Sequence, residues 1–257
     1  MHYLNFLNDA VGSSVADNLD LSIIVPAYNE QAFIGKLLVE ISSLEEYFEN
    51  RFEIIVVDDC STDETKQEVK KVFTERMVYL QTEANSGKGA AVQLGVSQSK
   101  GRYVLVQDAD LEYSPRDIPR MYSKVIHDNE VCVYGSRVKG AKNLGFPRNI
   151  LRLWPRQNAS SWLFNVMLSV WFFAIHRQWL TDLLTGYKLY PRSLFLDWKP
   201  ITKGFETDHE ITSIIMKLKM PIIEIPISYS PRSKLEGKKI RAKDGFIALR
   251  TFWRYRK

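Results

Sequence analysis

Two carboxylates separated by a single residue, Asp108 and Asp110, form the pattern in this sequence with the most direct chemical use. They follow an apolar run at residues 103–107 that is typical of a buried strand, and Glu112 extends the acidic segment. Mg2+ and Mn2+ prefer oxygen ligands, and a strand end can present two carboxylates to a cation that also binds a diphosphate. Because paired Asp residues also cap turns, the spacing by itself leaves open a metal site and a structural turn.

Two further segments contain residue types suited to a phosphorylated ligand. Asp58 and Asp59 end another apolar run, where a carboxylate either accepts hydrogen bonds from a base or ribose hydroxyl or only shapes a turn. Residues 85–91 (NSGKGAA) form a glycine-bearing turn that opens a helix, which suits close backbone approach to a ligand with Lys88 near its phosphates. The segment lacks the GxxxxGK[ST] spacing of a P-loop.

The elements that must position these residues alternate between strands and helices. Apolar, β-branched runs predict buried parallel strands, and the stretches between them have the periodicity or charge pattern of helices. The predicted strands are 21–25, 53–57, 103–107 and 131–134, and the predicted helices are 30–48 and 63–73. The pattern predicts an α/β fold with a mostly parallel central sheet flanked by helices, in which ligands bind beyond the carboxyl ends of the strands.

The second half of the chain has a different composition. Its predicted elements are an apolar helix at 162–175, a turn at Thr185-Gly186, a helix at 210–219, a strand at 222–229 and a basic tail. Residues 234–257 contain nine Lys or Arg residues and two acidic ones, while no acidic residue lies between Glu130 and Asp182. Segments whose charged residues are mostly basic favour anionic partners.

Length and cysteine content narrow the class of protein. The 257 residues suit one compact catalytic domain with ordinary globular composition. Cys60 and Cys132 lack metal-type spacing and favour a reducing, cytosolic compartment. Residues 1–20 lack the features of a signal peptide, and the apolar run at 162–175 is too short to span a bilayer.

Five motifs follow one another in a recognisable order. They are PAYNE (26–30), VVDDCSTDET (56–65), NSGKGAAVQLG (85–95), QDADLEYSP (107–115) and YGSR (134–137). Together they resemble family 2 glycosyltransferases of the GT-A fold, and specifically the dolichyl- and polyprenyl-phosphate sugar synthases. The likeness continues through 183–192, 204–212 and 236–245 and spans residues 21 to about 249.

The resemblance implies roles for individual residues. Pro26, Tyr28, Glu30 and Asp58 would hold the nucleotide, and the residue patterns described above add Asp59, Lys88 and Asp108 to the nucleotide-sugar site. Asp108, Asp110 and Glu112 would hold Mg2+ or Mn2+, with Asp110 and Arg137 acting in catalysis. Two departures from the family pattern concern Cys60 and Glu64, which stand where glycine is usual, and a third is Glu112, which replaces the Gln of the mannose synthases.

The positive charge of the second half of the chain is consistent with an acceptor substrate that carries a phosphate group. An ionised phosphate attacks the anomeric carbon without a general base, whereas a sugar hydroxyl needs one. The enzyme must then neutralise two anions and bring them together. The residues expected to face the acceptor phosphate are Arg137, Arg148, Arg152, Arg156, Lys238 and Lys239.

Three alternatives remain at this point. Transfer to a glycan hydroxyl would use a carboxylate of the acceptor half, for which Asp182 is the best candidate as base or orienting group. A nucleic-acid-binding protein would use the basic tail, but neither an RNP-type motif nor a recognition helix is present, so we expect no nucleic-acid partner. A catalytically inactive binding module is disfavoured by the intact Asp108/Asp110 pair.

The apolar helix at 162–175 is either part of the core or lies in the lipid interface, and its Trp residues and the cationic tail favour the interface. We therefore expect a peripheral enzyme on the cytosolic face of a membrane, acting alone or with a separate membrane subunit. The expected organisation is an N-terminal extension (1–20), a GT-A domain (21–235) and a basic amphipathic tail (236–257). Within the domain the donor half covers 21–137 and the acceptor half 138–235.

Overall fold

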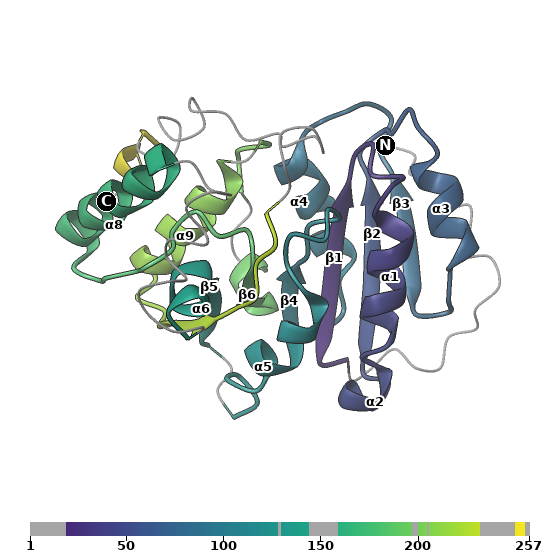
Figure 1. Ribbon diagram of the computed structural model, residues 1–257, viewed down its shortest axis with the longest axis horizontal. Coiled ribbons are helices and arrows are strands. Elements are labelled where there is room, and N and C mark those ends of the chain that lie inside the picture. Colours follow the sequence, from purple (N-terminus) through teal and green to yellow (C-terminus); the bar gives the residue numbers. More distant parts are fainter. Residues whose placement is uncertain are drawn as a thin grey trace.

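The computed structural model describes residues 19–127, 130–143, 159–196, 200–204, 206–231 and 250–254, and for 142–143 and 159–164 it describes the backbone alone. Within this part of the chain a mixed seven-stranded sheet has the order β3-β2-β1-β4-β6-β5-β7 (Figure 1). The strands are β1 Leu21–Ala27, β2 Phe52–Asp58, β3 Met77–Gln81, β4 Tyr103–Val106, β5 Cys132–Ser136, β6 Lys188–Pro191 and β7 Ile222–Pro226.

Strand direction brings the motif-bearing strand ends to one edge. β1, β2, β3 and β4 are mutually parallel, and β6 runs antiparallel to both β4 and β5. β5 therefore has the same direction as β4, and β7 pairs parallel with β5. The carboxyl ends of β1, β2, β4 and β5 consequently lie at the same edge, which is where ligands bind in open α/β sheets.

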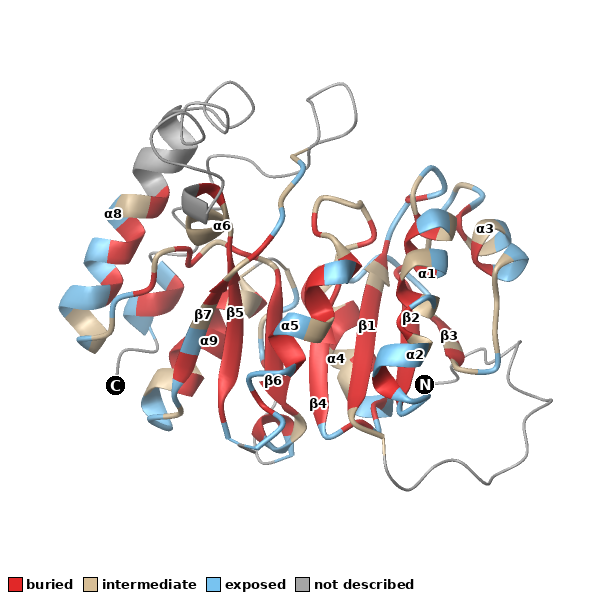
Figure 2. Cartoon of the chain, turned by 60° about the horizontal axis from the view of Figure 1, so that its bottom comes forward, coloured by how far each residue is buried: buried red, intermediate tan, exposed pale blue. Residues whose placement is uncertain are grey.

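Helices cover both faces of this sheet, and their apolar sides form its core. Their bounds are α1 Ile34–Ser42, α2 Glu45–Phe48, α3 Thr65–Lys71, α4 Lys88–Gln98, α5 Ile118–Tyr122, α6 Arg137–Asn143, α8 Ala159–His176 and α9 Thr207–Lys217, with 3-10 turns η1 Pro115–Asp117 and η2 Arg192–Phe195. On one face α1, α2 and α5 pack against alternate strand residues such as Ile23 and Val25, and on the other face α4 packs against Ile24. Figure 2 shows the strands buried and the outer helix surfaces exposed.

Most sequence-predicted elements are present, with informative exceptions. The predicted helix at 30–48 is broken into α1 and α2, and Ser43 Oγ donates to the Glu40 carbonyl at 2.7 Å at the break, a local bond that competes with helix continuation. β3 and β6 were not predicted. β6 is a four-residue strand that carries Lys188 and ends in Pro191, a composition with weak strand propensity, and its antiparallel pairing separates β5 from the predicted strands β1, β2 and β4.

The predicted apolar helix is α8, which lies at the end of the molecule beside residues 250–254 (Figure 1). Its inner face buries Leu168 and Phe172, and the Phe172 ring contacts Phe252 at a centroid distance of 5.2 Å. Its outer face exposes Met167, Val170, Trp171 and Phe173. Within the described segments, no helix has the combination of length and apolar character that crossing a bilayer requires.

Candidate active site

The PAYNE loop after β1 is fastened to the loop after β2. The Asn29 backbone N–H donates to Ser61 Oγ at 3.0 Å, and the Thr62 N–H donates to Asn29 Oδ1 at 2.8 Å. Glu30 is buried and its N–H donates to Thr65 Oγ1 at 2.8 Å. Pro26 is half-buried and Tyr28 is 36% exposed, so these two nucleotide-site predictions lie at an accessible part of the strand edge.

Asp58 and Asp59 are both buried and bonded within the protein. Asp58 accepts hydrogen bonds from the Ser61 N–H at 2.8 Å and from the Tyr79 hydroxyl at 2.5 Å, and burial together with this carboxylate raises the pKa of Tyr79. Asp59 accepts from the backbone N–H groups of Ser86 at 2.9 Å and Gly87 at 2.7 Å. Asp59 thereby holds the loop from which α4 starts.

The loop after β2 explains one of the two glycine departures. Cys60 has a φ of 62°, in the left-handed region that glycine adopts without steric cost. Glu64, with a φ of −79°, has no such requirement. A glycine at position 60 therefore suits the backbone, whereas position 64 accepts any residue.

Lys88 starts α4 and points at the carboxyl end of β4. Its ammonium lies 2.5 Å from Asp108 Oδ1, with side-chain exposures of 16% for Lys88 and 24% for Asp108. Burial alone would lower the pKa of Lys88, but the carboxylates of Asp108 and Asp208 outweigh it and raise this pKa above its usual value. Lys88 is therefore a fixed positive charge beside the first Asp of the DxD motif.

Glycine at position 186 lets the acceptor half reach this pair. A Cβ at Gly186 would lie 2.9 Å from Asp108 Oδ2 and 3.4 Å from Lys88 Nζ, and the Gly186 N–H donates to the Tyr113 hydroxyl at 3.0 Å. The predicted turn at Thr185-Gly186 thus lies against the carboxylate that was predicted to bind the donor.

The DxD loop presents two half-buried carboxylates, Asp108 and Asp110, at the strand edge. The Glu112 N–H donates to Asp110 Oδ1 at 3.1 Å, and Glu112 Oε2 accepts from the Tyr229 hydroxyl at 2.8 Å. Over the described part of the chain, no three His, Cys, Asp or Glu side chains form a group that could hold a metal ion. Asp108 and Asp110 offer hard oxygen donors at an accessible strand end, a donor set that suits a divalent ion whose remaining ligands come from a diphosphate.

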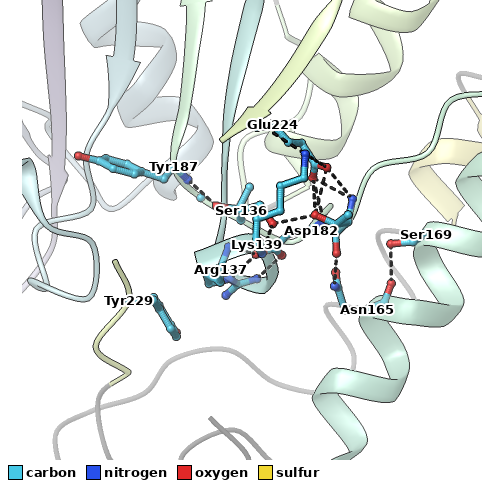
Figure 3. Close-up of polar contacts among 12 residues, drawn as sticks. Ser136, Arg137, Lys139, Asn165, Ser169, Asp182, Tyr187, Glu224 and Tyr229 are labelled. Atoms are coloured by element: carbon cyan, nitrogen blue, oxygen red, sulfur yellow. Dashed lines mark hydrogen bonds and ion pairs between the residues drawn. The ribbon is translucent and has the colours of Figure 1, made fainter. Parts of the chain in front are cut away.

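Arg137 is held by a network of polar contacts with neighbouring side chains and backbone (Figure 3). Its guanidinium donates to both Asp182 oxygens at 2.7 Å, and its backbone N–H donates to Asp182 Oδ2 at 3.0 Å. Arg137 is 15% exposed and Asp182 1%. Burial opposes the charged form of Arg137, but Asp182 raises the pKa of Arg137 well above its usual value, so Arg137 stays charged.

Glu224 of β7 accepts hydrogen bonds from the segment that carries Asp182. It accepts from the backbone N–H groups of Thr181 at 2.8 Å and Asp182 at 3.1 Å, and Lys139 Nζ lies 3.5 Å from it. These bonds fix the segment that carries Asp182. Glu224 was not predicted from the sequence, although an acid inside an otherwise apolar strand is a recognisable signal.

Lys188 and Tyr229 were also missed. Lys188 on β6 is 1% exposed and its ammonium lies 4.7 Å from the Tyr134 ring centroid; burial lowers its pKa. Tyr229 follows β7, and its ring lies 5.1 Å from the Arg137 guanidinium carbon. Lys188 lies in the family-like segment 183–192, but neither its spacing nor that of Tyr229 marks a functional site. The predicted phosphate-binding residues Arg148, Arg152, Arg156, Lys238 and Lys239 lie outside the described residues.

Comparison with known families agrees with the family that the five motifs predict. The family model described as Glycosyl transferase family 2 matches residues 22–184. The chain is 37% identical over 123 residues to the dodecaprenyl-phosphate galacturonate synthase of Rhizobium johnstonii, a match that covers 46% of this chain and 34% of that protein. It is 28% identical over 240 residues to the dolichyl-phosphate beta-glucosyltransferase of Saccharomyces cerevisiae, covering 87% of this chain and 70% of that protein. The chain thus spans about a third of the first relative and over two thirds of the second.

Solved structures show the same fold at low identity. Glucosyl-3-phosphoglycerate synthase from Mycobacterium tuberculosis, in complex with Mn2+, UDP and phosphoglyceric acid, aligns with a TM-score of 0.67 at 15% identity, covering 92% of this chain and 77% of that one. Mannosyl-3-phosphoglycerate synthase from Rubrobacter xylanophilus aligns with a TM-score of 0.65 at 20% identity, covering 92% and 73%. These likenesses confirm the predicted GT-A fold.

Proposed function

We propose that this chain, which belongs to glycosyl transferase family 2, transfers a sugar from a UDP- or GDP-linked donor to a polyprenyl phosphate with inversion at the anomeric carbon. The observation that carries the proposal is the buried Arg137–Asp182 pair, which fixes a guanidinium at the same sheet edge as Asp108. The names of the two relatives, a dodecaprenyl-phosphate and a dolichyl-phosphate enzyme, support this acceptor class.

The donor would lie across the ends of β1, β2 and β4. Pro26, Tyr28, Glu30, Asp58 and Asp59 surround or shape the part of the edge where a nucleoside would bind, with Asp58 and Asp59 acting mainly through the loops that they hold. When bound to Asp108, Asp110 and the donor diphosphate, Mg2+ or Mn2+ would neutralise the charge that develops on the departing nucleoside diphosphate. The solved complex of a GT-A neighbour with Mn2+ and UDP supports that choice.

The acceptor side of the site would contain an arginine, Arg137, instead of a base. An acceptor phosphate oxygen forms the bond to the anomeric carbon while the bond from that carbon to the diphosphate oxygen breaks, and the electron pair leaves with the nucleoside diphosphate. No proton has to be removed from an ionised phosphate. Both Asp182 oxygens already accept from Arg137, so Asp182 acts here by orienting Arg137 toward the acceptor phosphate.

The outer face of α8 would lie in the membrane interface. Its described side chains there are apolar and include Trp171, and the cations Arg177, Arg250 and Arg254 lie on neighbouring exposed positions. Aromatic and basic side chains together favour the headgroup region of anionic bilayers. We expect Trp171→Asp to weaken sedimentation with vesicles of anionic lipid, whereas Val39→Asp, at a comparably exposed position of α1, should leave it unchanged.

The reaction is tested with labelled UDP- and GDP-sugars, Mn2+ and a polyprenyl phosphate in vesicles. We expect an acid-labile glycosyl lipid from one donor and its loss in Asp110→Asn. A product formed only with a glycan acceptor would refute the acceptor class. Failure of every common donor to give a lipid product would refute the proposal as a whole.

A further inference from the structure

Tyr229 contacts two charged residues of the proposed site, Glu112 and Arg137. Its hydroxyl donates to Glu112 Oε2 at 2.8 Å, next to the DxD pair. Its ring centroid lies 5.1 Å from the Arg137 guanidinium carbon, a cation–π distance. Figure 3 shows Tyr229 on the segment after β7, with Arg137 between it and Asp182 in that view.

The backbone of the segment that carries Tyr229 is also hydrogen-bonded to the loop that follows the DxD motif. Tyr229 forms an isolated antiparallel bridge with Tyr113, and the Ser230 N–H donates to the Glu112 carbonyl at 2.9 Å. The Tyr229 and Tyr113 rings pack at a centroid distance of 5.3 Å, and Tyr113 stacks on Tyr187 at 5.1 Å with an interplanar angle of 13°. The Tyr229 ring therefore has a supported position.

The bond between the two side chains has a defined direction: the Tyr229 hydroxyl is the donor and the Glu112 carboxylate is the acceptor.

We propose that Tyr229 is a positioning residue with two separable actions: its hydroxyl holds Glu112 and the DxD loop for the divalent cation, and its ring holds the Arg137 guanidinium for the acceptor phosphate. The inference rests on the proposed function. A residue 117 positions away from Glu112 thereby links cation binding to acceptor binding. Hydrogen-bond partners behind metal-binding side chains commonly change metal affinity by about 10–100-fold when removed.

Two substitutions separate the two actions. Tyr229→Phe removes the hydroxyl and keeps the ring, and Tyr229→Leu removes both. Tyr47→Phe is the matched control, because Tyr47 also donates one hydrogen bond, to the Pro119 carbonyl, but lies on α2. Mn2+ affinity is measured from the electron paramagnetic resonance signal of unbound Mn2+ in the presence of UDP or GDP, and thermal unfolding is recorded for every variant.

We expect Tyr229→Phe to weaken Mn2+ binding by about tenfold with little change in the KM for polyprenyl phosphate. Tyr229→Leu should in addition raise that KM by about fivefold, the effect of one lost cation–π contact. Glu112→Ala should reproduce the Mn2+ effect, and adding Tyr229→Phe to it should cause no further loss.

Three results would overturn the inference: Mn2+ affinity in Tyr229→Phe within twofold of wild type, full additivity with Glu112→Ala, or an equal Mn2+ effect in Tyr47→Phe. Because the Mn2+ measurements need no acceptor, they are independent of the lipid assay. A wild-type protein that binds Mn2+ and nucleotide but makes no glycosyl lipid would refute the proposed function and leave the hydroxyl's action standing.

Discussion

Replacing Asp182 by Asn distinguishes an orienting carboxylate from a catalytic base. The substitution keeps the size and one carbonyl acceptor but removes the charge that balances Arg137. In the wild-type protein the Asp182 carboxylate accepts two hydrogen bonds of 2.7 Å from the Arg137 guanidinium and one of 3.0 Å from the Arg137 backbone N–H. With 1% of Asp182 and 15% of Arg137 exposed, solvent screens the pair only weakly.

The burial of the pair sets the expected size of the loss of stability. Removing one partner of a buried ion pair costs about 3–5 kcal/mol, and because Asn retains one acceptor we expect about 3 kcal/mol. For a chain of this length, about 2–4 °C per kcal/mol corresponds to a decrease in Tm of roughly 6–12 °C. Loss of a charge-assisted bond that orients Arg137 should raise the KM for the acceptor by on the order of tenfold.

Urea unfolding and steady-state kinetics at varied acceptor concentration measure the two effects. The control is Asp20→Asn, which breaks a partly exposed ion pair with Arg51 and should change stability by less than about 1 kcal/mol. A base role predicts instead a fall in kcat of about 10^2–10^4 with donor hydrolysis still measurable. That kinetic pattern, or an unfolding free energy within 1 kcal/mol of wild type, would refute the orienting role.

Three further predictions follow from single side chains. Cys60→Gly should raise Tm by about 1–2 °C in thermal unfolding, because glycine removes the strain of a φ of 62°, whereas Glu64→Gly, at a φ of −79°, should lower it. Lys88→Met should lower kcat/KM for the nucleotide sugar by about 10–100-fold, because Asp108 and the donor phosphates lose a shared cation; an unchanged kcat/KM would contradict this role. Burial and the charge of Lys188 lower the pKa of His209 to about 3. Between pH 6.5 and pH 3 this histidine is therefore protonated in the unfolded chain but not in the folded one, so the free energy of unfolding decreases as the pH is lowered. His209→Leu should therefore remove about 2 kcal/mol of the stability difference between pH 7 and pH 5 in urea unfolding, and an equally steep dependence in the variant would exclude His209 as its source.

Local patterns in the chain were sufficient for the donor side of the site. The apolar runs before Asp58 and Asp108 predict β2 and β4, and parallel strands place their carboxyl ends at one edge. The glycine-bearing segment before Lys88 predicts the start of α4. Each of these features depends on residues close together in the sequence, so periodicity and turn chemistry reveal it.

The acceptor side depends on pairings that no local pattern encodes. β6 has weak intrinsic strand propensity and forms because β4 and β5 pair with it on both sides. Its insertion also explains why the fourth predicted strand, β5, does not pair directly with β4. The break between α1 and α2 likewise results from a side-chain bond that competes with the helix.

The sequence by itself determined the α/β class, the strand-end carboxylates and the family motifs, because these follow from composition and short-range spacing. Only the tertiary structure decided that Asp182 pairs with Arg137 across 45 residues and that Tyr229 reaches Glu112 across 117. Such contacts are made when distant segments are brought together by strand pairing and core packing. Their energies depend on burial, which is a property of the folded chain and not of any segment of it.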